Sequence, residues 1–434
     1  MNDRRPPLAG VRVLAQGLVW AGPFGTMILA DLGAEVIEIE SIQHLNPTRA
    51  QLRHIPDVVL QSPMGSLYLN RDGSEGFWDR NVSFNYAKRG CLSATFDLQT
   101  ERGHELFLDL VKKADVFLEN NAAGVVEHLG IGWEVLHAAN PRLIMVRFPG
   151  FGITGPYAHH KGYGHNMEAV AGHTTVRGYA DSNPSTTPVS VHSDPNAGTH
   201  AAWAVQAALL ARERTGAGQL IEISQAEAVL HHIAFDVLDY EFNGRERSQR
   251  GNDHPAYAPY GVFPCAGQDR WIAIACTSDA AFAALMQHLG AAGFTDDERF
   301  ATTVARLRNR TAVNELVAER TPRYAAEELA RRLQGSGVAA AALAHQQEMH
   351  ADEHLTARGY FTPITHPAAG THLYPGPLGK LKYTADVPPF RPAPTLGQHN
   401  EYVYKELIGL SDQEYQKLVD DQVIGTVYLE TAHA

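Results

Sequence analysis

The beginning of the chain constrains its fold more than any other segment. Residues 11–15 form a short apolar run, residues 23–32 carry apolar side chains at helical spacing, and residues 35–40 alternate as a second strand. Gly33 follows the helical run, where glycine commonly ends a helix. A strand, a helix and a strand in this order form a β-α-β unit, which implies parallel strands joined by a right-handed crossover. The chain is therefore predicted to begin with an open α/β domain.

The same alternation returns after an irregular, polar stretch over residues 41–81. A glycine-rich turn over residues 149–157 follows it, and then an alanine-rich run that predicts a long helix. Further elements of the first domain are predicted as helices over 101–113, 124–129 and 196–212, and as strands over 116–119, 143–148 and 219–224.

The length of 434 residues exceeds what one compact core usually holds, so at least two domains are expected. The pattern of predicted elements changes near residue 250, beyond which short strands and helices predict a smaller α+β domain. The predicted organisation is a large domain over 1–225, a linker over 226–250, a small domain over 251–350, a linker over 351–395, and C-terminal helices over 396–434 that return to the large domain.

Composition excludes several classes of function. The net charge of -12, without a run of Lys or Arg, argues against nucleic acid as a partner. No apolar stretch reaches membrane-spanning length, and residues 1–7 do not form a signal peptide. Three cysteines without metal-ligand spacing predict a reduced, cytoplasmic setting, and the 22 scattered histidines predict no metal site.

The turn after the first strand does not carry a dinucleotide fingerprint. It reads Gln16-Gly17-Leu18-Val19-Trp20-Ala21-Gly22-Pro23 and lacks the GxGxxG pattern. Pro23 also removes one of the backbone amides that would bind a pyrophosphate at a helix start. NAD or FAD binding is therefore not predicted.

Asp194 allows two interpretations from its neighbours alone. Because Asp194 precedes Pro195 and the long predicted helix, its carboxylate is expected to cap a helix that begins at Pro195. A cap on backbone amides would keep the carboxylate ionised at neutral pH. A carboxylate at the start of a buried helix is also a nucleophile for activated acyl groups.

Several blocks, in order along nearly the whole chain, resemble the class III CoA-transferases, a family that also includes the α-methylacyl-CoA racemases. The likeness is carried by short motifs, of which the clearest are Ala30-Asp31-Leu32-Gly33-Ala34-Glu35, Asn85-Tyr86-Ala87-Lys88-Arg89-Gly90, Asn140-Pro141-Arg142-Leu143-Ile144, Ala258-Pro259-Tyr260-Gly261-Val262-Phe263 and Pro394-Thr395-Leu396-Gly397-Gln398-His399.

The resemblance implies a Rossmann-like large domain, a smaller domain and an interlocked homodimer. It implies transfer of coenzyme A from an acyl-CoA thioester to a free carboxylic acid, with coenzyme A as co-substrate and no tightly bound cofactor. Asp194 matches the position of the family's catalytic aspartate, which forms an aspartyl-CoA thioester. The oxyanion donors are expected either in the turn over residues 17–22 or near Gly261.

The resemblance also implies the residues around Asp194. Those expected to bind coenzyme A are Val19, Trp20, Ala21, Lys88, Arg89, Asn120 and Lys161. Those expected to line the acid pocket are Trp20, Tyr163, His165, Tyr257, Tyr260 and Gly261. Their aromatic character favours an acid larger than formate.

The chain departs from the family pattern beside Tyr163. Many members carry an acidic residue after this tyrosine, where the present chain has Gly164, and either His165 or Glu168 is a candidate to replace it. The racemase branch has a histidine at the position of Tyr163, and a phenol is a poor general base at neutral pH. Racemisation is therefore the first alternative function, and a non-catalytic CoA-binding protein is the second.

Overall fold

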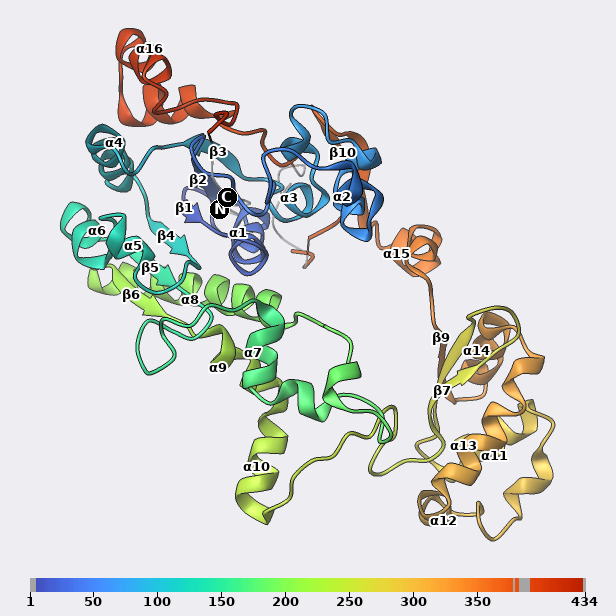
Figure 1. The fold of residues 1–434 in the computed structure, drawn as a ribbon. Helices are drawn as coiled ribbons and strands as arrows, with labels where there is room; N and C mark the ends of the chain where they lie inside the picture. The colour runs from blue at the N-terminus through green and yellow to red at the C-terminus, as the bar shows by residue number, and fades with distance from the viewer. Residues whose placement is uncertain (1–4, 378, 382–390, 432–434) are drawn as a thin grey trace. The chain divides into compact units, whose positions relative to one another are not determined.

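The computed structural model describes residues 5–377, 379–381 and 391–431. The chain divides into two compact units, drawn in Figure 1. The first unit draws on three parts of the chain and the second on two: residues 1–173, 189–238 and 358–434 for the first, and residues 174–188 and 239–357 for the second.

A six-stranded parallel sheet organises the first unit, in the order β3-β2-β1-β4-β5-β6. This order confirms the predicted Rossmann-like α/β class. The strand order runs outward from β1 to β3 on one side and from β4 to β6 on the other, so it changes direction between β1 and β4. In such sheets the reversal opens a crevice at the carboxyl ends of the two central strands, where ligands bind. The strands are β1 (Arg12–Gln16), β2 (Glu35–Glu40), β3 (Leu92–Thr95), β4 (Val116–Glu119), β5 (Ile144–Arg147) and β6 (Gln219–Glu222).

Helices cover both faces of this sheet, which explains the near-continuous apolar character of its strands. Leu14 in β1 belongs to the core shared with α4 (Glu101–Val111), whereas its neighbour Val13 belongs to the core shared with α1 (Ala21–Asp31) and α8 (Ser193–Thr215). Shorter helices of this unit are α2 (Asp57–Gln61), α3 (Val82–Ala87), α5 (Val125–His128), α6 (Trp133–Ala139) and α7 (Gly164–Val170).

The second unit has a separate α+β core. Its antiparallel sheet has the order β7-β8-β9, and its apolar residues form one cluster with the helices. The elements are β7 (Tyr260–Pro264), β8 (Trp271–Ala275), β9 (Ala339–Ala342), α11 (Asp279–His288), α12 (Thr303–Arg308), α13 (Arg310–Ala318), α14 (Ala326–Gly335) and α15 (Glu353–Ala357).

The two predicted linkers contain regular structure. The segment over 226–250 carries most of α9 (Gln225–Leu230) and all of α10 (Ala234–Asn243). The segment over 351–395 contains the hairpin β10 (Phe361–His366) and β11 (Gly370–Pro375), while its residues 382–390 lie outside the described part of the chain.

The C-terminal segment docks on β3, the edge strand of the parallel sheet. The His399 amide donates to the Ser93 carbonyl oxygen over 2.9 Å, and the side chain of Asn400 accepts from the Thr95 amide over 2.8 Å. The segment then forms a π-helical stretch over Tyr402–Ile408 and α16 (Asp412–Asp420). It thus protects an edge that would otherwise expose unpaired backbone groups. Among the described residues, no helix is both long and apolar enough to span a bilayer.

Candidate active site

Asp194 is positioned by a close crossing of α1 and α8. A side-chain carbon added at Gly198 would lie 2.6 Å from the Ala21 carbonyl oxygen and 2.8 Å from the Gly25 amide nitrogen, so only glycine permits this approach. Residues four apart share one face of a helix, which puts Asp194 one turn before Gly198 and Ala21 one turn before Gly25. The crossing therefore brings the start of α1 against the second turn of α8, one turn from Asp194.

Asp194 does not cap α8, so this prediction was wrong. The helix begins at Ser193, and its N-cap residue is His192, which makes no side-chain capping bond. Asp194 thus lies inside the first turn, and its carboxylate accepts no hydrogen bond from the described residues, although the residue is only 8% exposed. Burial first, and the charge of Glu168 second, raise the pKa of Asp194 to about 6. The sequence predicted that backbone amides would stabilise the ionised carboxylate. Burial and the Glu168 charge destabilise the ionised form instead.

Glu168 in α7 holds the segment that leads into Asp194. Its side chain is completely buried, and its two oxygens accept from the Ser190 hydroxyl over 2.8 Å and from the His192 backbone amide over 2.5 Å. His173 lies 4.0 Å from the same carboxylate. Of the two candidates to replace the missing acid, Glu168 faces this site, and His165 is exposed.

Gly164 leaves no room for a side chain beside the carboxylate. A carbon added there would lie 2.7 Å from the Ser193 hydroxyl oxygen and 2.9 Å from Asp194 Oδ2. The Ser193 hydroxyl is buried and has no hydrogen-bond partner among the described residues. The backbone of α7 therefore contacts the carboxylate directly, at the position where many family members carry an acid.

Three imidazole rings lie near Glu168, the carboxylate next to Asp194. The ring centroids of His173, His192 and His232 are 6.0 to 6.3 Å apart. Burial and the neighbouring His192 lower the pKa of His232. Within the described residues, no cluster of His, Cys, Asp or Glu is arranged to hold a metal ion.

Asn120 clamps the turn that precedes α1. Its side-chain oxygen accepts from the Leu18 amide over 2.7 Å, and its nitrogen donates to the Leu18 carbonyl oxygen over 3.1 Å. Val19, the next residue, has φ of +58°, a strained conformation for a β-branched side chain, and it is exposed. The clamp thus holds Val19, Trp20 and Ala21 at the carboxyl edge of the sheet, and their expected contact with coenzyme A stays a prediction.

Lys88 and Arg89 disagree with their expected role as ligands of the CoA phosphates. Lys88 is fully buried and its ammonium lies 2.5 Å from Glu38 Oε1, while Arg89 is buried and lies 2.7 Å from Asp31 Oδ2. A charge that is enclosed and paired in the core cannot reach a phosphate in an open cleft. The motif that contains them is therefore structural here, and Lys161, which is exposed, is the remaining candidate.

The other predicted pocket residues occupy two different units. Tyr163 is the exposed N-cap residue of α7 and His165 follows it. Tyr257, Tyr260 and Gly261 belong to the second unit, where Tyr257 and Tyr260 contact the ring of His254. Their contribution to a site around Asp194 stays a prediction.

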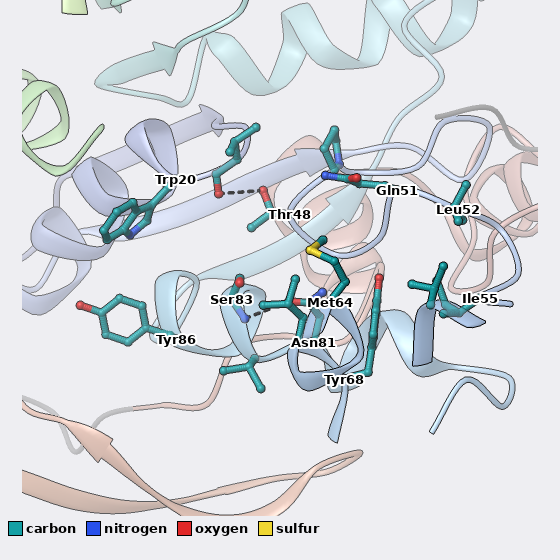
Figure 2. A pocket seen from close by; sticks show the side chains of 15 residues that line it. Trp20, Thr48, Gln51, Leu52, Ile55, Met64, Tyr68, Asn81, Ser83 and Tyr86 are labelled. Atoms are coloured by element: carbon teal, nitrogen blue, oxygen red, sulfur yellow. Dashed lines mark hydrogen bonds between the residues drawn. The ribbon is translucent and has the colours of Figure 1, made fainter. Parts of the chain in front are cut away.

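Two cavities open near the turn over residues 17–22. One, of about 450 Å³, lies at the carboxyl ends of β1, β2 and β4 and is lined by Gln16, Leu18, Glu40 and Asn121 among others. The other, of about 490 Å³, is bounded by Val19 and Trp20 and by residues of the irregular stretch before α3 (Figure 2). The sequence analysis did not predict that the irregular stretch before α3 lines a cavity. The apolar residues Ile55, Val59 and Leu67 in this otherwise polar stretch were a signal for it.

Comparison with known proteins agrees with the motifs. A model of CoA-transferase family III matches residues 8–400. The succinyl-CoA–D-citramalate CoA-transferase of Chloroflexus aurantiacus is 34% identical over 426 residues, or 98% of this chain and 100% of the relative. The succinate–glutarate CoA-transferase of Agrobacterium fabrum is 32% identical over 94% of this chain and 97% of its own length.

A solved structure agrees as well. A CaiB/BaiF family protein from Brucella suis has a TM-score of 0.81 to this chain at 31% identity, covering 93% of this chain and 100% of the other. The chain therefore belongs to CoA-transferase family III and is an enzyme that transfers coenzyme A.

Proposed function

We propose that this enzyme moves coenzyme A from an acyl-CoA to a free carboxylic acid with Asp194 as its nucleophile. The observation that carries this proposal is a buried carboxylate that has no hydrogen-bond partner among the described residues and a pKa raised to about 6. Such a carboxylate is ionised at neutral pH but poorly stabilised, so it is more basic and more nucleophilic than one in water.

Each step of the route exchanges one acyl bond for another. A carboxylate oxygen of Asp194 attacks the thioester carbonyl carbon, the CoA thiolate leaves, and a mixed anhydride forms. The thiolate then attacks the aspartyl carbonyl carbon, which releases the donor acid as its carboxylate and leaves an aspartyl-CoA thioester. The acceptor carboxylate attacks this thioester and expels the thiolate, which finally attacks the acceptor's carbonyl carbon. The new acyl-CoA leaves and the Asp194 carboxylate is restored.

We place the nucleotide end of coenzyme A in the cavity of about 450 Å³ at the carboxyl ends of β1, β2 and β4. This is the crevice in which open α/β sheets bind nucleotides. No further tightly bound cofactor is required by this route. The three cysteines of the chain are free and buried, which suits the cytoplasm as a reducing compartment.

The acids remain a separate question. The relatives described above are named for succinyl-CoA with citramalate and for succinate with glutarate. We take from them only the reaction class, an acyl-CoA with a free carboxylic acid. Tyr163 and His165 do not favour the racemase alternative, since both are exposed, and the buried groups near Asp194 include the carboxylate of Glu168 and the imidazole of His173.

A homodimer is part of the proposal. Large apolar side chains stand exposed on α10, where Phe235 is 88% and Phe242 is 77% exposed, and others are Trp203 and Leu210 on α8. Exposed apolar surface of this kind commonly marks an interface between chains. Light scattering is expected to give the mass of a dimer, and replacement of Phe235 and Phe242 by Asp should reduce it to that of one chain.

The nucleophile is tested by Asp194→Ala. We expect transfer to fall by about 10⁴-fold or more, as for other covalent nucleophiles, while the variant still binds acyl-CoA in calorimetry. Activity that survives the substitution would refute the assignment. Incubation of the wild type with a 2-methylacyl-CoA in deuterated water, without an acceptor acid, separates the racemase: deuterium at the α-carbon would favour the alternative.

A further inference from the structure

Among the described residues, the wall of the cavity bounded by Val19 and Trp20 contains no Asp, Glu, His, Lys or Arg. Apolar side chains form most of this wall, and its polar groups are hydroxyls, two of them phenols, and amides (Figure 2). The described residues that line it are Val19, Trp20, Pro47, Thr48, Gln51, Leu52, Ile55, Val59, Met64, Leu67, Tyr68, Asn81, Val82, Ser83 and Tyr86.

Two of these polar groups are already engaged. Asn81 Oδ1 accepts from the Ser83 and Phe84 amides over 2.8 and 3.3 Å, and the Thr48 hydroxyl donates to the Val19 carbonyl oxygen over 3.4 Å. A second carboxylate on a bound acid would find no cation among the described lining residues, and burying an unpaired charge is strongly unfavourable. An uncharged hydrocarbon chain would instead gain from the apolar wall.

The turn before α1 connects this cavity to the helix crossing that positions the proposed nucleophile. Trp20 lines the cavity and is the residue directly before α1, and the carbonyl of the next residue, Ala21, packs against Gly198, one turn from Asp194. An acid whose carboxyl group reaches Asp194 past Trp20 can place its tail in this space. At about 490 Å³, the cavity lies within the range of roughly 300 to 1,000 Å³ that small-molecule pockets span.

We propose that this cavity holds the uncharged tail of the acyl group, so that the enzyme acts on monocarboxylic acids with an aliphatic or aromatic body and discriminates against dicarboxylic acids. The inference rests on the proposed function, because it names the substrate class of the same reaction. It separates this chain from relatives named for succinate and glutarate.

Acids of matched length test the proposal. With one acyl-CoA donor, kcat/KM is measured for hexanoate against adipate and for butyrate against succinate. We expect a preference of at least about tenfold for the monocarboxylate in each pair, because a second charge has no partner. Within the monocarboxylates, kcat/KM should rise by about fourfold for each added methylene, the equivalent of about 0.8 kcal/mol, until the cavity is full. Equal or better use of adipate and succinate would overturn the proposal.

A charge introduced into the wall gives the second test. Met64→Lys places an ammonium in the cavity, and it should lower kcat/KM for hexanoate and raise it for adipate. Val58→Lys is the matched control, since Val58 lies on the neighbouring helix α2, is 75% exposed and does not line the cavity. The same response from both variants would contradict the assignment.

The outcomes separate the two proposals. If Met64→Lys fails to fold, as thermal melting would reveal, the substrate series with the wild type still decides the question. Absence of transfer to any acid, or transfer that survives Asp194→Ala, would count against the proposed function. Asp194-dependent transfer with a preference for dicarboxylic acids would overturn only the substrate class.

Discussion

Two regions of the first unit handle buried carboxylates in opposite ways. At the end of β2, Glu40 accepts from Arg49 Nε over 2.6 Å and Nη2 over 2.8 Å, and from the Ser93 hydroxyl over 2.6 Å. Burial alone would raise the pKa of Glu40, but the Arg49 charge and these hydrogen bonds outweigh it and lower that pKa. At the start of α8, Asp194 has burial without a cation, and its pKa rises to about 6.

The difference indicates what each carboxylate does. Arg49 also binds Asp79 over 2.7 Å and the Pro394 carbonyl oxygen over 3.0 Å, so the Glu40 network joins the sheet to the C-terminal segment. Glu119 is likewise paired, with Arg147 Nε at 2.8 Å. The chain supplies partners to carboxylates that hold the fold together, whereas Asp194 lacks one and has Glu168 as a like-charged neighbour. Such an arrangement weakens the folded state locally and is expected where chemistry occurs.

The largest expected effect is the loss of stability when the Glu40–Arg49 pair is broken. Glu40→Gln leaves Arg49 buried without its main partner, and we expect the free energy of unfolding to fall by about 3–5 kcal/mol. Asp194→Asn removes a charge that burial disfavours, so the unfolding free energy should stay level or rise at pH 7. Chemical denaturation of both variants measures the contrast, and equal losses in the two would contradict it.

A smaller effect is expected from crowding the unpaired carboxylate. Gly164→Ala puts a carbon within 2.9 Å of Asp194 Oδ2 and must displace it or α7. Overpacking of this kind costs about 1–3 kcal/mol, so kcat/KM should fall by about 5- to 150-fold if that cost is met by moving the carboxylate. Val170→Ala, at an exposed position at the end of α7, is the control and should retain activity. A fully active Gly164→Ala variant would show that this contact does not position Asp194.

The smallest expected effect is a shift in pH dependence. The reaction needs ionised Asp194, so kcat/KM of the wild type should rise with pH through a value near 6. Glu168→Gln removes the like charge but keeps one acceptor oxygen for the segment before α8. The pKa of Asp194 should then fall, and the acidic limb of the pH profile should move to lower pH.

Glu213→Gln is the control for this pH shift, since Glu213 is exposed near the far end of α8 and its loss should not move the limb. If the acidic limb of the kcat/KM profile does not move in Glu168→Gln, Glu168 does not raise the pKa of Asp194.

Folding contributes to the same pH dependence. The pKa of Asp194 is raised on folding, so the folded state binds its proton more tightly than the unfolded chain does. Wild type should therefore gain stability relative to Asp194→Asn as pH falls from 7 through about 6 toward the ordinary value of 3.8. This sign is opposite to that expected for Glu40, whose lowered pKa makes the Arg49 pairing weaker as pH falls.

Local patterns in the sequence predicted the elements of the fold well. The strand expected over 11–15 is Arg12–Gln16, and the helix expected over 23–32 is Ala21–Asp31. Periodicity depends on a residue and its near neighbours, so it finds such elements. The sheet order depends on contacts between distant segments, which periodicity does not report. The helices in the predicted linker over 226–250 were missed although Ser224 and Glu227 have the spacing of a helix start.

The site shows the same limit more sharply. Family resemblance pointed to Asp194 as the proposed nucleophile, but its environment depends on residues that no spacing connects to it, such as Glu168 through the His192 amide. Lys88 and Arg89 were assigned to phosphates because a motif shows charge and not burial. The cap was wrong because α8 begins at Ser193, two residues earlier than the sequence suggested.

The central claim is that the unpaired carboxylate of Asp194 carries the acyl and CoA groups in turn. The most direct measurement is peptide mass spectrometry after the wild type reacts with an acyl-CoA in the presence of hydroxylamine. The account predicts an aspartyl hydroxamate at Asp194, formed only when acyl-CoA is present and accompanied by loss of activity. A hydroxamate on another carboxylate, or continued transfer with Asp194 unmodified under the same conditions, would contradict it.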